Sequence, residues 1–143
     1  MPKRVYDRAY ASVRFWSPTL DPLSVTLALR LPPDHIHHDG EPRLSRTRKG
    51  IVRQYAAYRG GMWSMSSRRW VDSPRLAMHI EWLLSQLEPK MDAIGALRRD
   101  GSKVDFFCYS SGSPSQPPSL PRALRQRAAA LGIDVEIDHY CTL

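Results

Sequence analysis

The sequence predicts a small α+β protein in which an antiparallel or mixed sheet of four to five strands carries its helices on one face. Three observations support this class. Apolar residues alternate with polar ones in several short segments, an amphipathic helix pattern spans 76–87, and a strand–loop–helix order occurs twice, over 13–31 and 106–131. The two similar units around a central hairpin and helix pair give an arrangement that is ferredoxin-like in outline.

The length of 143 residues and the 42% hydrophobic content fit a single domain over residues 1–143. The chain has no run of eighteen apolar residues, and its charged N-terminus is not followed by an apolar segment. We therefore expect neither a membrane span nor a signal peptide. Two cysteines, Cys108 and Cys141, are too few for a secreted disulfide framework, so we expect a cytoplasmic protein with free thiols.

The first strand and the first helix have clear local signals. Alternation over 10–16 places small and large apolar residues on one side of a strand. After a Ser-Pro-Thr break, Asp21 can cap a helix and Pro22 suits its first turn, and this short helix stops at Pro32.

The next segment, 34–50, contains histidines and arginines without apolar periodicity, and it predicts a flexible basic loop. Residues 51–58 then suit an edge strand, and the glycines in 59–61 suit a turn into a strand over 62–67. The sequence thus predicts a hairpin between these two strands.

In the second half, the motif at residues 72–74 is a strong helix start, and apolar residues then follow one face to Leu87. Pro89 ends or kinks this helix. Two further helices are expected over 91–100 and 120–131, and two further strands over 104–109 and 134–140.

Positive charge is concentrated between residues 43 and 75. This segment contains nine basic residues and one acidic residue, so it accounts for more than the whole formal net charge of +7. Such a patch attracts anionic partners, whether acidic proteins, nucleic acids or phosphate-bearing ligands. The predicted partner-binding residues are Arg43, Arg46, Arg48, Lys49, Arg53, Arg59, Arg68, Arg69 and Trp70.

Catalysis and metal binding have weaker support. His35, His37 and His38 lie close together in the chain, but a zinc site needs three or four converging ligands, usually from more than one element. Cys108 and His139 fall on the same side of their strands, yet Cys108 lies mid-strand among apolar residues, which predicts an inert buried thiol. The sequence has no glycine-rich phosphate loop and no nucleophile elbow. We expect no enzymatic activity, no metal and no cofactor.

Several separated motifs are similar to those of a known family. They are Leu20-Asp21-Pro22, Gly40-Glu41-Pro42, Gly61-Met62-Trp63-Ser64, His79 to Pro89, Asp105 to Tyr109 and Leu131 to Asp138. On these residues, which span nearly the whole chain, the protein resembles the bacterial family called domain of unknown function 4279. The sequence departs from the family in a long arginine-rich insert between Pro42 and Gly60 and in the histidines before Gly40. The resemblance implies a shared fold and no particular activity.

We therefore expect a binding protein. The first hypothesis is a small non-enzymatic accessory protein, of a toxin-neutralising or inhibitor type, that engages an acidic partner protein through the basic segment. The alternative is a nucleic-acid-binding protein that uses the same segment, with Tyr55, Tyr58 or Trp70 stacking on bases. No membrane partner is expected, and the sequence leaves a homodimer open.

The expected open face of the sheet is a poor surface for nucleic acid. Aromatic residues fall on it, but four carboxylates share the same side and would repel a phosphate backbone. These carboxylates belong to Asp105, Asp134, Glu136 and Asp138.

Overall fold

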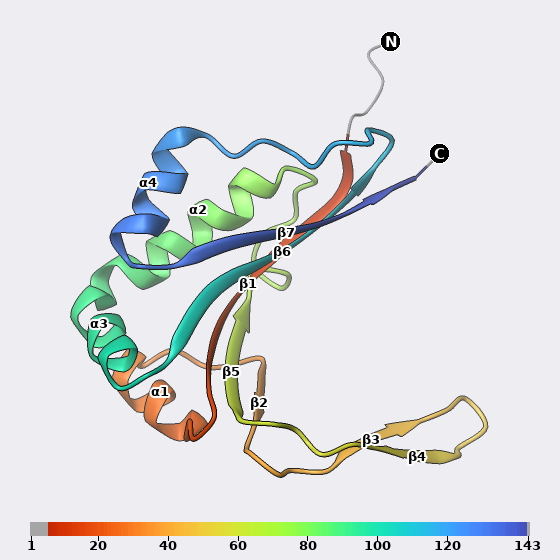
Figure 1. The fold of residues 1–143 in the computed structure, drawn as a ribbon. Helices are drawn as coiled ribbons and strands as arrows, with labels where there is room; N and C mark the ends of the chain where they lie inside the picture. The colour runs from red at the N-terminus through yellow and green to blue at the C-terminus, as the bar shows by residue number, and fades with distance from the viewer. Residues whose placement is uncertain (1–5, 143) are drawn as a thin grey trace.

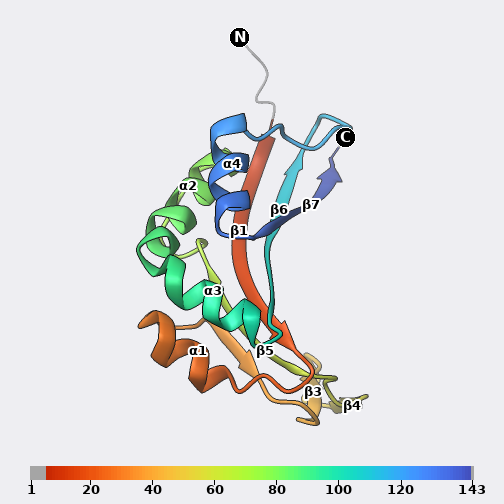
Figure 2. The ribbon, with the colours of Figure 1, turned by 60° about the vertical axis from the view of Figure 1, so that its left-hand side comes forward.

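The computed structural model describes residues 6–142. In this part of the chain, four α-helices and one 3-10 helix accompany a five-stranded mixed sheet and a separate two-stranded sheet (Figure 1). The helices form a layer on one face of the five-stranded sheet, as Figure 2 shows from a second direction. The predicted α+β class, with a mixed sheet and helices on one face, is confirmed.

The order of strands in the large sheet is β2-β5-β1-β6-β7. The central strand β1 (Tyr6–Ser17) pairs antiparallel with β5 (Gly61–Ser66) and with β6 (Lys103–Gly112). At the edges, β2 (His35–His37) pairs antiparallel with β5, and β7 (Asp134–Cys141) pairs parallel with β6. Strand β2 therefore runs parallel to β1 with β5 between them, which is the split βαβ arrangement expected from the sequence.

The helices connect and cover these strands. Helix α1 (Pro22–Leu29) joins β1 to β2, and α4 (Arg122–Ala130) joins β6 to β7, so both predicted strand–loop–helix units are present. Between them lie α2 (Leu76–Leu87), a 3-10 turn at Glu88–Lys90 and α3 (Met91–Arg99). The 3-10 turn contains Pro89, which interrupts the helical pattern where the sequence predicts it.

The two helix starts differ in how well the sequence predicts them. The Asp21 side chain accepts a hydrogen bond from the backbone N–H of Leu23 and caps α1 as expected. Helix α2 begins only at Leu76, after the predicted start at 72–74. The backbone carbonyl of Ser73 is bonded to the His79 ring at 2.8 Å and stays outside the helix.

The core lies between the helix layer and one face of the sheet. Val13 and Phe15 of β1, Phe106 and Cys108 of β6, and Trp63 of β5 all have 0% exposure. The buried face of α2 packs onto them with Leu76, Ile80, Leu83, Leu84 and Leu87. Residues of opposite parity on the same strands therefore form the face that no helix covers.

The segment predicted as a flexible basic loop at 34–50 instead contains β2 and the first strand of a hairpin. Strand β3 (Arg43–Arg46) pairs antiparallel with β4 (Val52–Tyr55) as a separate two-stranded sheet. The predicted hairpin between 51–58 and 62–67 is wrong, because β5 pairs with β1 and β2 and not with β4.

A tight turn connects β3 to β4 and brings the two strands together. The backbone N–H of Gly50 donates to the carbonyl of Thr47, and the N–H of Thr47 donates to the carbonyl of Ile51. The Thr47 hydroxyl also accepts from the Ile51 N–H at 3.2 Å. Gly50 has φ 76°, a left-handed conformation that glycine adopts without a steric cost.

Candidate functional site

The hairpin formed by residues 43–55, which we call the basic arm, extends away from the large sheet (Figure 1). All eight residues of its two strands are exposed. The arm carries no acidic residue and five of the predicted partner-binding residues: Arg43, Arg46, Arg48, Lys49 and Arg53.

The arm exposes apolar side chains among its cations. The register pairs Arg43 with Tyr55 on one face and Arg46 with Val52 on the other. Leu44 is 64% exposed and Val52 is 54% exposed. Both side chains project from the same face of the ribbon and form a small apolar surface among the cations.

The base of the arm is fixed to the edge of the large sheet. The Tyr58 ring stacks on His37 with centroids 3.6 Å apart, and the guanidinium of Arg43 lies 5.2 Å from the centroid of Tyr58. The Asp39 carboxylate accepts a hydrogen bond of 2.7 Å from the Gly60 N–H. Burial lowers the pKa of His37, and its Nδ1 has no hydrogen-bond partner among the described residues. These stacking contacts and the hydrogen bond hold the base of the arm against the edge of the sheet.

Arg59 lies at the junction between the arm and the sheet. Its side chain is exposed, and its carbonyl accepts a hydrogen bond of 3.1 Å from the Trp16 indole. Trp16 also lines the cavity described below, so the base of the arm and the cavity are neighbours on the molecule.

The remaining predicted residues, Arg68, Arg69 and Trp70, lie after β5, at the opposite end of that strand from the arm. The Arg69 guanidinium is 3.8 Å from the Asp34 carboxylate. Trp70 is 61% exposed and stacks on Trp82 of α2, with centroids 6.1 Å apart. The predicted site is therefore two separate surfaces, the arm and this connection, and not one continuous patch.

The uncovered face of the sheet carries an ion-pair cluster at its centre. Arg14 donates two hydrogen bonds to Asp105, at 2.8 and 2.7 Å, and lies 3.5 Å from Glu136. The bonds to Asp105 raise the pKa of Arg14. The Arg14 guanidinium also lies 4.6 Å from the centroid of Phe107. Arg14 is therefore held in place by its own sheet, and its charge is already balanced.

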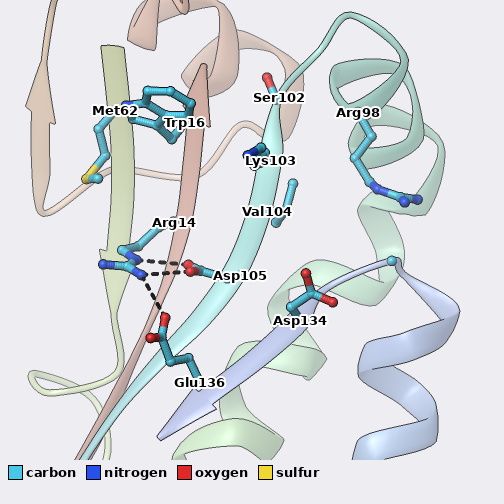
Figure 3. Close-up of a pocket in the computed structure, with 11 residues that line it drawn as sticks. Arg14, Trp16, Met62, Arg98, Ser102, Lys103, Val104, Asp105, Asp134 and Glu136 are labelled. Atoms are coloured by element: carbon cyan, nitrogen blue, oxygen red, sulfur yellow. Dashed lines mark hydrogen bonds and ion pairs between the residues drawn. The ribbon is translucent and has the colours of Figure 1, made fainter. Parts of the chain in front are cut away.

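A cavity of about 800 Å³ opens beside this cluster, where β6 begins before β7 has joined it (Figure 3). Its walls combine the apolar surfaces of Trp16 and Met62 with three positively and three negatively charged side chains. The charged residues around it are Arg14, Arg98, Lys103, Asp105, Asp134 and Glu136.

Farther along the same face, three tyrosines stand in a row across β1, β6 and β7. Tyr10 and Tyr109 stack at 4.9 Å, and Tyr140 tilts against Tyr109 at 5.5 Å. The guanidinium of Arg68 lies 5.2 Å from the centroid of Tyr10. Tyr10 and Tyr109 thus cover one ring face of each other, while Tyr140 at the end of the row is 52% exposed.

The structure brings together a buried Ser–His pair that the sequence did not predict. The Ser67 hydroxyl lies 2.7 Å from Nδ1 of His79, but the two residues are 0% and 1% exposed. A substrate cannot reach this pair. Cys108 is also buried, and burial raises the pKa of its thiol to about 12. Both nitrogens of His139 are bonded elsewhere, to Ser110 and to the carbonyl of Pro114.

Within residues 6–142, no three His, Cys, Asp or Glu side chains gather closely enough to hold a metal ion. The same residues include no helix with the length and apolar content needed to cross a membrane.

The fold and these surfaces define a class of small α+β protein that presents a cationic arm beside an uncovered sheet face with a charge-balanced cavity. Residues 7–142 match the family described as domain of unknown function (DUF4279), and the chain belongs to this family. The searches of curated proteins and of solved structures found no significant match.

Proposed function

We propose that this protein is a small non-enzymatic accessory protein that binds an acidic partner protein through the basic arm. The supporting observation is that the arm presents five cations, no carboxylate and several apolar side chains on a ribbon exposed on both faces. In the same proposal, the protein acts in the bacterial cytoplasm as a toxin-neutralising or inhibitor-type protein.

The two kinds of side chain on the arm have different tasks in such a complex. Cations raise the rate of encounter with an acidic surface and reject basic ones, while they add little net affinity at an exposed rim. Leu44 and Val52 supply apolar area that loses its contact with water when a partner covers it. The arginines also stack and form paired hydrogen bonds with carboxylates, which lysine cannot do.

A pull-down tests the proposal. The tagged full-length protein should capture a specific acidic protein, and charge reversal at Arg46, Arg48 and Lys49 to Glu should abolish the capture. The matched control reverses Arg99, Arg122 and Arg125, which are exposed cations on α3 and α4, and changes the net charge equally. Capture that survives reversal of the arm, or that disappears equally in the control, would overturn the proposal.

The second candidate is nucleic-acid binding by the same arm. It is favoured by the shape of the arm, because the major groove of DNA admits a two-stranded β-ribbon. The exposed Leu44 and Val52 favour a protein partner instead, since a phosphate backbone gains little from apolar contacts.

Salt titration distinguishes the two candidates. Binding to duplex or single-stranded nucleic acid would weaken steeply with salt, by about one unit of log–log slope per phosphate contact. An electrophoretic or anisotropy assay at low salt with the unmodified protein gives the result. Affinity that vanishes with the arm reversal would favour nucleic acid, and no binding at low salt would eliminate it.

A further inference from the structure

The open side of the molecule carries a second surface whose charge is opposite to that of the basic arm. Asp134, Glu136 and Asp138 alternate along β7, which places their side chains on the uncovered face of the sheet. We call these three residues the acidic strip. Strand β7 is an edge strand, because only β6 pairs with it in the described sheet.

The carboxylates of the strip differ in how far they are available to a partner, because Asp138 is half-buried and accepts a hydrogen bond of 3.0 Å from the Tyr140 hydroxyl. The Arg14 guanidinium is committed to Asp105 through two short hydrogen bonds, and it lies at 3.5 Å from Glu136. The Glu136 side chain is still 65% exposed, and Asp134 is exposed at the mouth of the cavity (Figure 3). The cations Arg98 and Lys103 also line this cavity, so the strip is most acidic along β7 itself.

The arm cannot neutralise the strip of its own molecule. The arm leaves the sheet next to β2 and β5, and β7 lies at the other edge of the strand order. Four strand spacings separate these edges, which is about 19 Å. The arm also points away from the sheet and from β7 (Figures 1 and 2). A complementary pair of surfaces that cannot meet within one chain can meet between two chains.

We propose that the basic arm binds the acidic strip of a second copy of this chain. This inference rests on the proposed function, in which the arm binds an acidic protein surface. Each copy has one arm and one acidic strip, so a two-fold dimer satisfies both surfaces of both copies. The base of the arm contacts Trp16, which lines the cavity on the same uncovered face that carries the strip.

The apolar parts of the two surfaces match as well. The arm exposes Leu44 and Val52, and the cavity beside the acidic strip has an apolar wall formed by Trp16 and Met62. The outer edge of β7 also has free backbone groups that an extended segment of the arm can pair with.

Light scattering and sedimentation of the purified full-length protein test the inference. At low salt the mass should rise with protein concentration toward twice the 16.3 kDa of one chain. Near 1 M salt, where charges are screened beyond about 3 Å, it should return to one chain. A protein that stays monomeric at low salt and high concentration would overturn the inference.

Two charge-reversed variants locate the interface. The arm variant (Arg46, Arg48 and Lys49 to Glu) and the strip variant (Asp134, Glu136 and Asp138 to Lys) should each be monomeric. An equimolar mixture of the two should form heterodimers, because each contact again pairs opposite charges. If either variant dimerises alone, or if the mixture stays monomeric, the inference is wrong.

Controls separate folding defects and the failure of either proposal. The Arg99, Arg122 and Arg125 reversal should leave the dimer unchanged. Circular dichroism checks the fold, and Asp134→Lys alone, at an exposed position, replaces the strip variant if the triple change unfolds. A monomeric protein whose arm still captures a foreign acidic protein would overturn the dimer and leave the proposed function standing.

Discussion

Replacement of Ser67 by alanine should destabilise the protein far more than the loss of one exposed hydroxyl. The Ser67 oxygen accepts a hydrogen bond of 3.0 Å from the Ala11 N–H in the central strand. Nε2 of His79 must donate to the Ser73 carbonyl, because a carbonyl only accepts. Nδ1 of His79 is then an acceptor, and the Ser67 hydroxyl donates to it.

The expected magnitude follows from this network. Ser67→Ala leaves two buried groups without a partner, the Ala11 N–H and Nδ1 of His79. Each unsatisfied buried donor or acceptor costs about 1 to 3 kcal/mol, so the free energy of unfolding should fall by about 2 to 6 kcal/mol. That is a large part of the 5 to 15 kcal/mol that typically separates folded and unfolded domains.

Urea denaturation, followed by circular dichroism, measures the loss. The control is Ser66→Ala, whose hydroxyl accepts only an exposed hydrogen bond from the Arg68 N–H and should cost about 1 kcal/mol. The double variant Ser67→Ala/His79→Leu should lose less than the sum of its single changes, since the two side chains interact. A loss below 1 kcal/mol for Ser67→Ala would refute the network as a stabilising element.

Three further predictions follow from burial and close approach. In the native protein a thiol reagent at pH 8 should modify one thiol, the exposed Cys141, while Cys108, whose pKa burial raises to about 12, reacts only in denaturant; two fast native thiols would contradict this. Gly61→Ala should lower the free energy of unfolding by about 1 to 3 kcal/mol, because the added methyl group overlaps the backbone of the β1–α1 connection. Gly95→Ala, inside α3, places the added methyl group in ordinary contact with the flexible Arg99 side chain at 3.4 Å and should instead stabilise by about 0.5 to 1 kcal/mol; equal effects of the two changes would be inconsistent with the packing. Burial lowers the pKa of His37 in the folded protein. As the pH decreases below about 6.5, the unfolded chain therefore takes up the proton first, and the free energy of unfolding should decrease. In His37→Phe this part of the pH dependence should disappear. Urea midpoints measured between pH 7.5 and 5 test this, and a variant whose midpoints depend on pH as steeply as those of the unmodified protein would contradict the prediction.

The elements that one-sided burial specifies could be predicted from the sequence. In 104–109 every second residue enters the core, so the alternation is visible without a structure. The strands of the basic arm are exposed on both faces and therefore leave no such alternation. The turn from Thr47 to Gly50 is the one local signal that could have identified the arm.

Charge counting finds the basic residues but not their arrangement. Arg43 and Arg68 belong to one basic segment in the sequence, yet β5 separates the surfaces on which they lie. The bond between Arg14 and Asp105 joins residues 91 positions apart, and only the pairing of β1 with β6 makes it visible. Contacts of this kind depend on the topology, which local patterns do not encode.

The position of β1 has a consequence for how the chain folds. The strand at the centre of the sheet is the first in the sequence, and its most extensive partner, β6, ends at Gly112. During synthesis, about a hundred further residues have to be added after β1 before its longer ladder, with β6, can form. Pairings between such distant residues close slowly and leave apolar strands exposed in the meantime. A ribosome-bound chain truncated before β6 should therefore remain unfolded and depend on chaperones, although most of its sequence is already present.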